Sequence, residues 1–408
     1  MKRFILIVLD SFGVGAMDDV PEVRSQDLNS NTCLHLLEQS SKYRIELPNL
    51  MEMGLINALN REISGFEKSD RCLYGTSNLK HFGADSFYGH QEIAGTNPKM
   101  PVFHPLSLFI NEICLSLEGH GFSVERLVYN DNELICVNNV IIVGDNMETD
   151  FGQAINVVGA LDYCGFKMIT EVGRIVRNIV KVPRVIAFGG SDVTIKDIKD
   201  AIISKNKFVG VDAPSSGVYK RNYHVEHMGY GIDETKQVSY ALSDKNIVSN
   251  FYGKVANIVA NPYPNNKDGV DTEEIFENLV ADLKENKLGF YFANIQETDL
   301  AGHSEDSERY IDRLNVSDYW IGKIRALLNE DDILLITADH GNDPTIGHSK
   351  HTRERVPLLI DIVGRNKLNS PIYIGNRATL ADIGQTVADY FNTHVEFGES
   401  FLDYIRKL

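Results

Sequence analysis

Near its C-terminus the chain carries adjacent side chains that could bind a metal ion. The run is Asp339-His340-Gly341-Asn342-Asp343, and His351 follows eleven residues after His340. It comes directly after the apolar segment Ile333 to Ala338, which is typical of a buried strand. A carboxylate and an imidazole at a strand end, with a second imidazole on the following loop, suit a metal centre for hydrolysis or phosphoryl transfer. The charge of Asp339 at the end of a buried strand also needs compensation, which a cation would supply.

Two more apolar segments lead to carboxylates. Phe4 to Leu9 runs into Asp10, and Phe290 to Ile295 precedes Asp299, which has His303 four residues after it. That spacing lets Asp299 and His303 reach one ion from a helical turn or from a glycine-containing loop, although it is common in proteins without a metal. A lone Asp at a strand end, such as Asp10, is more often a turn or cap residue than a ligand.

The loop after Asp10 excludes one alternative. Gly13 and Gly15 form the Gly-x-Gly of a dinucleotide-binding turn, but the third small residue of that fingerprint would stand at position 18, which is Asp18. The Rossmann fingerprint therefore fails.

The order of these segments predicts an α/β fold. Short, continuously apolar strands with helical patterns between them are typical of a mostly parallel sheet covered by helices on both faces. Helices are expected from about Asp306 to Leu328 and from about Leu380 to Phe391. Because ligands gather at the C-terminal ends of parallel strands, Asp10, Asp299 and Asp339 are expected to meet at one edge of the sheet.

A hydroxyl lies in the run Ala84-Asp85-Ser86-Phe87-Tyr88-Gly89-His90. Ser86 could act as a nucleophile if a metal ion lowered its pKa and oriented it. His90 and Glu92 could orient this turn or face a substrate, although the solvated start of a helix explains them as well. No G-x-S-x-G motif near Ser86 supports an acyl-transfer triad.

Together these residues form a candidate site of three carboxylates, three imidazoles and one hydroxyl. Divided between two ions, the set suits borderline-hard divalent metals such as Mn²⁺ or Zn²⁺, because no thiolate takes part. Two ions that flank one hydroxyl fit in-line phosphoryl transfer. The members of the set are Asp10, Ser86, Asp299, His303, Asp339, His340 and His351.

The composition indicates a globular chain with a small-molecule partner. With 408 residues, 43% of them apolar, the chain is long enough for two domains. Its net charge of 40 minus 57, or −17, disfavours binding to nucleic acid or to an anionic membrane.

The five cysteines include no C-x-x-C pair, which favours the reduced cytosol. Phe4 to Leu9 is too short for a signal-peptide core, and no apolar run is long enough to span a membrane.

The middle of the chain interrupts the α/β pattern. A proline-rich stretch from Asn97 to Pro105 breaks it, and strands such as Val137 to Val143 and Arg184 to Ala187 then alternate with helical stretches. This pattern predicts an inserted α+β cap domain. The expected bounds are 1–102 and 212–408 for the metal-binding catalytic core, 103–211 for the cap, and Asp212 to Gly217 for the return linker.

Six runs carry a likeness to a known family: Val8 to Ala16, Leu47 to Leu50, Asp85-Ser86 with Gly89-His90, Thr337 to Pro344, His351 to Glu354, and Val356 to Leu359. They resemble phosphopentomutase, which belongs to the alkaline phosphatase superfamily alongside cofactor-independent phosphoglycerate mutase. The resemblance covers about the first hundred residues and the C-terminal half, and the run from Thr337 to Pro344 is highly specific.

The resemblance implies an alkaline-phosphatase-like core with an inserted cap, two Mn²⁺ ions, with Zn²⁺ or Mg²⁺ as alternatives, and a phosphorylated hydroxyl. In that scheme Asp10, Asp339 and His340 hold one ion. Asp299, His303 and His351 hold the other, and Ser86 lies between the ions as a ligand and phosphoryl carrier. The family moves phosphate between the C1 and C5 oxygens of ribose or deoxyribose, in nucleoside metabolism, after a sugar bisphosphate has primed the carrier residue.

The chain departs from the family at several positions. Ser86 stands where threonine is usual, Gln91 stands where tryptophan is usual, and the segment Asp299 to His303 is one residue shorter than usual. In the cap, Gly144 to Glu148 replaces a Thr-Ser-Ala-Asp type run, and Phe188 to Asp192 replaces an Arg-containing loop. The core therefore predicts phosphoryl transfer, and the cap leaves the substrate open.

Further residues stay open. Lys254 could place a cation near the transferred group, although a surface lysine is the ordinary interpretation. His224 and His227 form an H-x-x-H pattern without a neighbouring acid on a clear helix, so no third metal site is expected. His348 lies close to His351 in sequence, but the family spacing favours His351 as the ligand.

The leading hypothesis is a cytosolic two-metal phosphomutase that acts on a small-molecule sugar phosphate. A cap of about a hundred residues favours a mutase over a hydrolase, because a closing cap excludes the water that hydrolyses a phosphorylated intermediate. A phosphatase or phosphodiesterase with the same centre, and a non-catalytic sugar-phosphate sensor, are the alternatives. A sulfatase is disfavoured because no Cys or Ser stands in a C/S-x-P-x-R setting.

Overall fold

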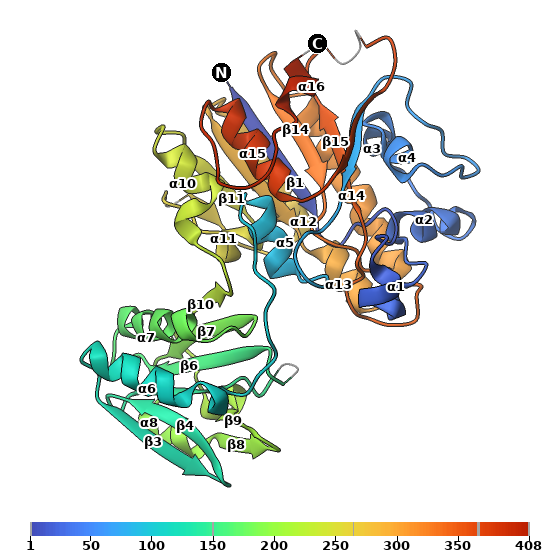
Figure 1. The fold of residues 1–408 in the computed structure, drawn as a ribbon. Helices are drawn as coiled ribbons and strands as arrows, with labels where there is room; N and C mark the ends of the chain where they lie inside the picture. Colours follow the sequence, from blue (N-terminus) through green and yellow to red (C-terminus); the bar gives the residue numbers. More distant parts are fainter. Residues whose placement is uncertain (1, 149–150, 264, 365–367, 407–408) are drawn as a thin grey trace. The chain divides into compact units, whose positions relative to one another are not determined.

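The computed structural model describes residues 2–148, 151–263, 265–364 and 368–406. The chain forms two compact units, one from Met1–Asn97 with Asp233–Leu408 and one from Pro98–Ile232 (Figure 1). The second unit extends beyond the predicted insertion of 103–211. β10 (His224–Gly229) pairs with β7 (Arg184–Gly190), so the chain passes the predicted return linker before it leaves this unit. The roles of the two units as catalytic core and cap stay predictions.

The first unit is built on a mixed, mostly parallel sheet. Among the described residues it has eight strands in the order β12-β11-β13-β1-β14-β15-β2-β16. The central strand β1 (Arg3–Leu9) is buried along its whole length and runs parallel to both neighbours, β13 (Gly289–Ile295) and β14 (Ile333–Thr337). The other strands are β2 (Leu73–Ser77), β11 (Ser249–Tyr252), β12 (Asn266–Lys267), β15 (Val356–Asp361) and β16 (Ile372–Arg377).

The register of the three central strands brings their C-terminal ends to one edge. Leu9 lies opposite Ile295, and Val8 lies opposite Thr337. The residues that follow these strands, among them Asp10 and Asp339, therefore start from the same edge of the sheet. The predicted α/β class with a mostly parallel sheet is confirmed.

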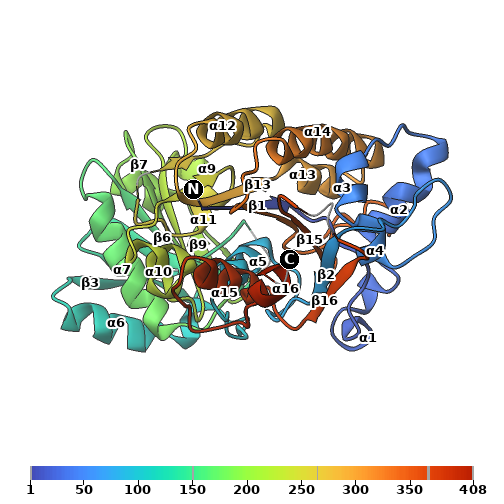
Figure 2. The same ribbon diagram turned by 90° about the horizontal axis from the view of Figure 1, so that it is seen from above.

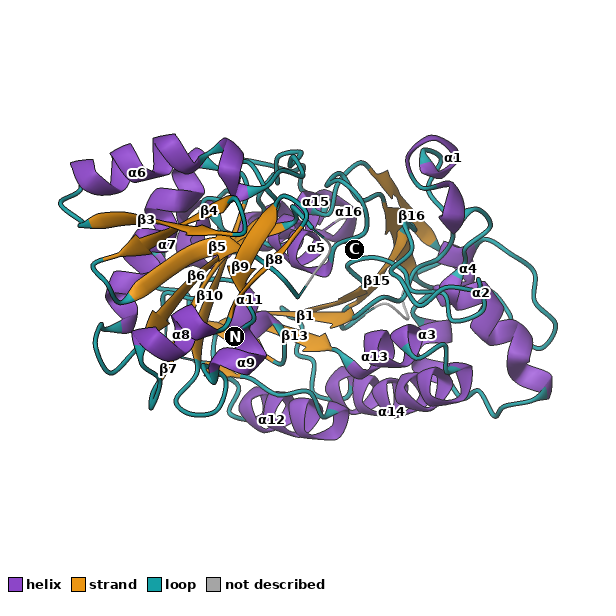
Figure 3. Ribbon diagram, turned by 90° about the horizontal axis from the view of Figure 1, so that it is seen from below, coloured by secondary structure: helices purple, strands orange, loops and turns teal. Residues whose placement is uncertain are grey.

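Helices cover both faces of this sheet (Figures 2 and 3). One face carries α3 (Pro48–Glu52), α12 (Thr272–Lys284), α13 (Glu297–His303) and α14 (Ser307–Arg325). The other face carries α5 (Ser86–Ile93), α10 (Val238–Ser243), α11 (Val255–Ile258), α15 (Ala381–Tyr390) and α16 (Leu402–Arg406). The two helices expected from periodicity are α14 and α15.

Shorter helices complete the first unit. They are α1 (Val20–Val23), η1 (Ser25–Asp27), α2 (Thr32–Leu37), η2 (Glu38–Ser41), α4 (Leu55–Leu59) and η4 (Glu234–Lys236). Helix α14 begins where the side chain of Asp306 accepts a hydrogen bond from the backbone N–H of Arg309, and it buries Ile311, Leu314 and Ile321. Within the described ranges, no helix combines the length and the apolar character that a membrane span requires.

The second unit has its own core around a separate sheet. Among the residues described, its strand order is β10-β7-β6-β5-β4-β3, with β6 and β7 parallel and the other neighbours antiparallel. Its further strands are β3 (Val124–Tyr129), β4 (Asn132–Val137), β5 (Ile141–Asp145), β6 (Ala154–Ala160), β8 (Ile202–Lys205) and β9 (Phe208–Val211). Its helices are η3 (Leu106–Leu108), α6 (Ile110–Gly119), α7 (Phe166–Ile179), α8 (Ile195–Asp200) and α9 (Ala213–Ser216).

The predicted single strand from Val137 to Val143 is wrong. The chain turns after Val137, and β4 pairs antiparallel with β5. Asn138 and Asn139 have φ angles of 49° and 54°, in the left-handed region that asparagine tolerates in tight turns. The two asparagines within the apolar run were the signal for this hairpin.

Asp145 makes the stability of the second unit depend on pH. Its carboxylate accepts hydrogen bonds from the backbone N–H groups of Leu106 (2.8 Å) and Val209 (2.9 Å), and burial raises its pKa from 3.8 to about 6. Because the folded pKa is the higher one, the stability that this group contributes is present below pH 3.8 and is lost as pH rises through about 6. We expect a contribution of roughly 2 to 3 kcal/mol to disappear across that window.

Urea unfolding of Asp145→Asn and of the wild-type protein at several pH values measures this contribution. The free energy of unfolding should fall less steeply with pH in the variant, while the exposed control Asp200→Asn should follow the wild type. Equal slopes in Asp145→Asn and wild type would contradict the assignment.

Candidate metal centre

Three buried groups meet at the C-terminal edge of the sheet in the first unit. Asp10 follows β1, Asp339 and His340 follow β14, and one ligand atom from each lies within 4.8 Å of the others. The side chains of all three are fully buried. His340 Nε2 is 3.2 Å from Asp339 Oδ2 and 3.6 Å from Asp10 Oδ1.

A second group adjoins the first. Asp299, His340 and His351 also offer ligand atoms within 4.8 Å of one another, so His340 belongs to both groups. His351 Nε2 is 3.3 Å from Asp299 Oδ1, and His303 Nε2 is 3.4 Å from Asp299 Oδ2. His303 and His351 approach to 2.9 Å between their Nε2 atoms. The structure therefore brings the three carboxylates and three imidazoles of the predicted ligand set together.

Local structure explains how the ligand atoms are oriented. Asp299 and His303 are four residues apart on α13 and thus share one face of the helix. His303 Nδ1 lies 2.7 Å from the carbonyl oxygen of Ser349, and His351 Nδ1 lies 2.8 Å from that of Ala84. Since a carbonyl only accepts, Nδ1 carries the proton in each ring, and each Nε2 is left with a lone pair for a metal ion.

Three neighbouring carboxylates shift the pKa values of the groups in this site. Burial and the neighbouring Asp339 raise the pKa of Asp10 to about 6. Burial lowers the pKa of His340, but the carboxylates of Asp339, Asp299 and Asp10 outweigh it and raise that pKa to about 9. Asp10, Asp299 and Asp339 are thus held close together in a buried site, where repulsion between ionised carboxylates is unfavourable.

The residues present fit a divalent metal ion. Asp10 Oδ1 and His340 Nε2 are buried and have no hydrogen-bond partner among the described residues, although buried polar atoms are normally paired. Carboxylate oxygens and imidazole nitrogens without thiolates are the donors that Mn²⁺, Zn²⁺ and Mg²⁺ accept. The assignment of each residue to a particular ion stays a prediction.

Ser86 lies at the side of this centre, at the first residue of α5. Its hydroxyl donates to Asp339 Oδ2 at 2.7 Å. Asp85 caps the helix by accepting a hydrogen bond from the backbone N–H of Tyr88. A Cβ atom on Gly89 would lie 2.8 Å from the carbonyl oxygen of Asp339, so glycine at this position lets α5 approach the end of β14.

Lys254 is not the surface lysine that the sequence suggested. Its side chain is 19% exposed, and its ammonium group donates to Ser86 Oγ at 2.6 Å and to Asp10 Oδ2 at 3.0 Å. Burial lowers the pKa of this lysine, but the three nearby carboxylates outweigh burial and raise it above its usual range. A permanent positive charge therefore faces the oxygen of Ser86.

His90 and Glu92 are buried and do not form a solvated helix start. His90 Nδ1 donates to the carbonyl oxygen of Ser86 at 2.9 Å, and Asn294 Nδ2 donates to His90 Nε2 at 2.9 Å and to Asp10 Oδ2 at 3.0 Å. Glu92 accepts a hydrogen bond from His81 Nδ1 at 2.7 Å. Both residues thus fix α5 and Ser86. Asn294 was missed, although one amide side chain within the apolar run of β13 was a signal for it.

The three histidines that the sequence left open, His224, His227 and His348, lie outside both groups of ligand atoms. His348 Nε2 is 3.4 Å from Asp27 Oδ1. His224 and His227 lie on β10 of the second unit, where His224 Nε2 is 3.1 Å from Asn222 Oδ1.

The fold and this centre define a metalloenzyme. The profile described as Metalloenzyme superfamily matches residues 2–395, so the chain belongs to that superfamily. It is 30% identical over 420 residues to the phosphopentomutase of Symbiobacterium thermophilum, which covers 100% of this chain and 99% of the relative. It is 29% identical over 418 residues to the phosphopentomutase of Clostridium kluyveri, with 100% of both chains covered. The chain belongs to the phosphopentomutase family, and it is a metal-binding enzyme of the phosphotransferase and isomerase class.

Two solved structures match this chain over most of its length. The PH0037 protein from Pyrococcus horikoshii has a TM-score of 0.43 at 17% identity, and the match covers 97% of this chain and 98% of that chain. Phosphoglycerate mutase from Leishmania mexicana has a TM-score of 0.41 at 12% identity, with 97% of both chains covered.

Proposed function

We propose that this enzyme is a two-metal phosphomutase that transfers a phosphoryl group between the C1 and C5 oxygens of ribose or deoxyribose phosphate. Ser86 is the phosphoryl carrier, and a sugar bisphosphate primes it. The observation that carries the proposal is the position of Ser86 Oγ, 2.7 Å from Asp339 Oδ2 and 2.6 Å from Lys254 Nζ. A hydroxyl at this place, beside two groups of metal-binding side chains, suits phosphoryl transfer.

Asp10, Asp339 and His340 would hold one ion, and Asp299, His303 and His351 would hold the other, with Ser86 as a further ligand. Mn²⁺ is the favoured metal, and Zn²⁺ and Mg²⁺ also suit these donors. When bound, two divalent ions acidify the serine hydroxyl and neutralise charge on the phosphoryl oxygens.

The protein's own residues prepare Ser86 for its role. The hydroxyl proton points to Asp339, so a lone pair of Ser86 Oγ is free to face an incoming phosphoryl group. Lys254 donates to the same oxygen and stabilises negative charge that develops on it. His90 and Asn294 hold α5 relative to Asp10, which fixes the distance between the carrier oxygen and the metal-binding carboxylates.

The second unit, Pro98–Ile232, serves in this proposal as the substrate cap. A mutase must protect the phosphorylated serine from hydrolysis while the sugar reorients, and a cap that excludes water gives this protection. The same centre without such protection would act as a phosphatase.

An isomerisation screen tests the function. The Mn²⁺-loaded protein is incubated with ribose 1-phosphate, deoxyribose 1-phosphate and other sugar phosphates, together with a catalytic amount of sugar bisphosphate. The proposal predicts the isomeric sugar phosphate with little free phosphate. Free phosphate without isomer would identify a phosphatase, and the absence of both products would contradict both enzymatic functions.

Lys254→Met should lower the isomerisation rate about 100- to 1,000-fold and leave metal affinity nearly unchanged, because the variant removes the charge at Ser86 Oγ but no metal-binding atom. Steady-state rates and calorimetric Mn²⁺ titration measure the two effects. The exposed control Lys245→Met should match the wild type. A rate within about threefold of wild type in Lys254→Met would remove Lys254 from the mechanism.

A further inference from the structure

The first unit contains a large polar cavity besides the metal centre. The cavity has a volume of about 1110 Å³, and its lining comes from the loop after β1, from α2 and α4 with the residues beside them, and from β2 and β16. Within the described part of the chain, none of the seven residues predicted for metal binding and phosphoryl transfer belongs to this lining. The cavity is therefore separate from the site proposed for catalysis.

Two tyrosines at the edge of the sheet give this cavity an aromatic surface. Tyr74 of β2 lies directly opposite Tyr373 of β16, the last strand in the sheet order, and the two ring centroids are 5.3 Å apart at 35°. Tyr373 is 51% exposed. Beside this pair of residues, Thr76 Oγ1 donates to Asn376 Oδ1 at 2.9 Å. An exposed aromatic face that strand pairing holds in place suits the flat ring of a ligand.

Arg61 gives the cavity a positive charge that no carboxylate balances. Its guanidinium group makes no hydrogen bond or ion pair with the residues that the structure describes. By contrast, Arg355 in the same lining pairs with Asp18, and His35 pairs with Asp343. Arg61 is thus the charged side chain left for a ligand, and a planar guanidinium group suits a phosphate or carboxylate group.

Two further polar groups in the lining lack a partner. Ser30 is 2% exposed, and its hydroxyl makes no hydrogen bond to another described residue, although buried hydroxyl groups are normally paired. Asn31 Oδ1 accepts a hydrogen bond from the backbone N–H of Leu34 at 3.1 Å, and its Nδ2 has no partner in the described ranges. A phosphate group has three terminal oxygens and can therefore use a guanidinium, a hydroxyl and an amide donor together.

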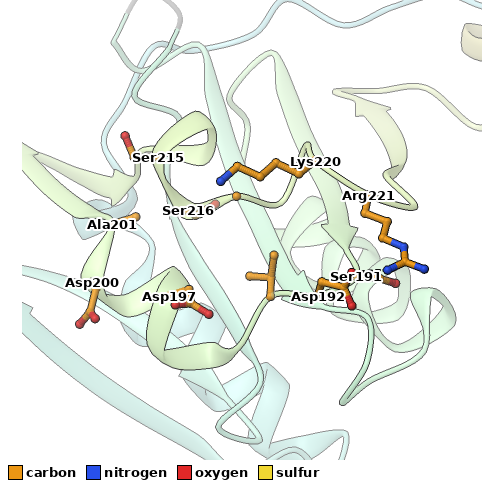
Figure 4. Close-up of a pocket in the computed structure, with 11 residues that line it drawn as sticks. Ser191, Asp192, Asp197, Asp200, Ala201, Ser215, Ser216, Lys220 and Arg221 are labelled. Atoms are coloured by element: carbon orange, nitrogen blue, oxygen red, sulfur yellow. Dashed lines mark hydrogen bonds and ion pairs between the residues drawn. The ribbon is translucent and has the colours of Figure 1, made fainter.

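A cavity in the second unit has the opposite balance of charge (Figure 4). It has a volume of about 640 Å³, and its lining combines Lys220 and Arg221 with Asp192, Asp197 and Asp200. Arg221 is paired with Asp192. An anion would meet carboxylates there, and like charges at short distance repel. Of these two cavities, the one in the first unit is the better site for an anion.

We propose that the cavity of the first unit binds a small phosphate-bearing ligand that also carries a flat ring, the chemistry of a nucleoside monophosphate. Arg61 binds the phosphate group, Ser30 and Asn31 donate to its oxygens, and the ring packs on Tyr373. Binding at this site requires neither the metal ions nor Ser86.

Calorimetric titration of the full-length, Mn²⁺-loaded protein with AMP tests this site. We expect AMP to bind the wild type, and Arg61→Met and Tyr373→Ala should each weaken binding at least about tenfold, whereas Tyr373→Phe should keep it. The exposed Arg44→Met is the matched control and should bind AMP as the wild type does. Asp339→Asn should also bind AMP with unchanged affinity, because this substitution lies at the metal centre.

Two part-ligands test the two halves of the proposed ligand. In Asp339→Asn, adenosine and inorganic phosphate should each bind at least about tenfold more weakly than AMP. Either part-ligand binding as tightly as AMP would overturn the proposed ligand.

Three results would overturn the site itself: no AMP binding to the wild type, equal AMP affinity in Arg61→Met and the wild type, or loss of AMP binding in Asp339→Asn. The last result would place AMP at the metal centre. If Tyr373→Ala does not fold, the exposed Arg61→Met decides the question.

Discussion

Replacing Ser86 by alanine is expected to lower isomerisation by at least about 10⁴-fold, because the variant has no oxygen to carry the phosphoryl group. Metal affinity should fall little, since Asp10, Asp299, Asp339 and the three imidazoles remain. The hydrogen bond that this side chain donates to Asp339 Oδ2 contributes only modestly to the position of that carboxylate. Steady-state rates and Mn²⁺ titration of the same protein preparation measure both quantities.

Two matched variants sharpen this experiment. Ser86→Thr keeps the hydroxyl and should retain measurable isomerisation, whereas the exposed Ser41→Ala should behave as the wild type. Isomerisation by Ser86→Ala at a rate near that of the wild type would remove Ser86 from the mechanism.

Asp339→Asn is expected to weaken metal binding and to lower turnover together. Asp339 Oδ2 lies 2.7 Å from Ser86 Oγ and 3.2 Å from His340 Nε2, and Oδ1 accepts a hydrogen bond from the backbone N–H of Ser11 at 3.1 Å. An amide keeps the shape of the side chain but loses the charge that a cation requires. Mn²⁺ affinity should fall by at least about 100-fold, and isomerisation should fall by at least about 10³-fold.

The comparison with Ser86→Ala separates the role of phosphoryl carrier from the role of metal ligand. Ser86→Ala should lose isomerisation and keep its Mn²⁺ affinity, whereas Asp339→Asn should lose both. Asp403→Asn, an exposed carboxylate in α16, serves as the control. Unchanged Mn²⁺ affinity in Asp339→Asn would show that this residue is not a ligand.

The edge of the sheet where the site lies could be predicted because its strands are apolar along their whole length. The continuous apolar sequences of β1, β13 and β14 alone indicate buried strands. Parallel pairing of these strands then places Asp10 and Asp339 at one edge of the sheet. The pair Asp299 and His303 followed from helical spacing. In each case a local pattern, a strand end or a helical turn, determines where the side chain points.

Lys254 and Asn294 could not be placed by the same means. Lys254 directly precedes the four-residue helix α11, and its side chain contacts Asp10 and Ser86, which are distant from it in sequence. Asn294 lies in an apolar run whose other members face the core. The sharing of His340 between two groups of ligand atoms depends on side-chain positions at the ends of separate strands.

In the second unit, the sequence did not predict a turn and a contact between distant segments. The turn residues Asn138 and Asn139 were predicted as part of one strand, Val137 to Val143, because apolar residues stand on both sides of them. The contact of Glu148 and Phe188 with Tyr219 joins segments that no periodicity connects.

Mass-spectrometric mapping of the protein after reaction with Mn²⁺ and a sugar bisphosphate tests the central claim most directly. The account predicts one phosphate on the peptide that contains Ser86, lost again when excess sugar monophosphate is added, and no phosphate in Ser86→Ala. A phosphate on a different residue, or none in a metal-loaded protein that still isomerises sugar phosphates, would contradict it.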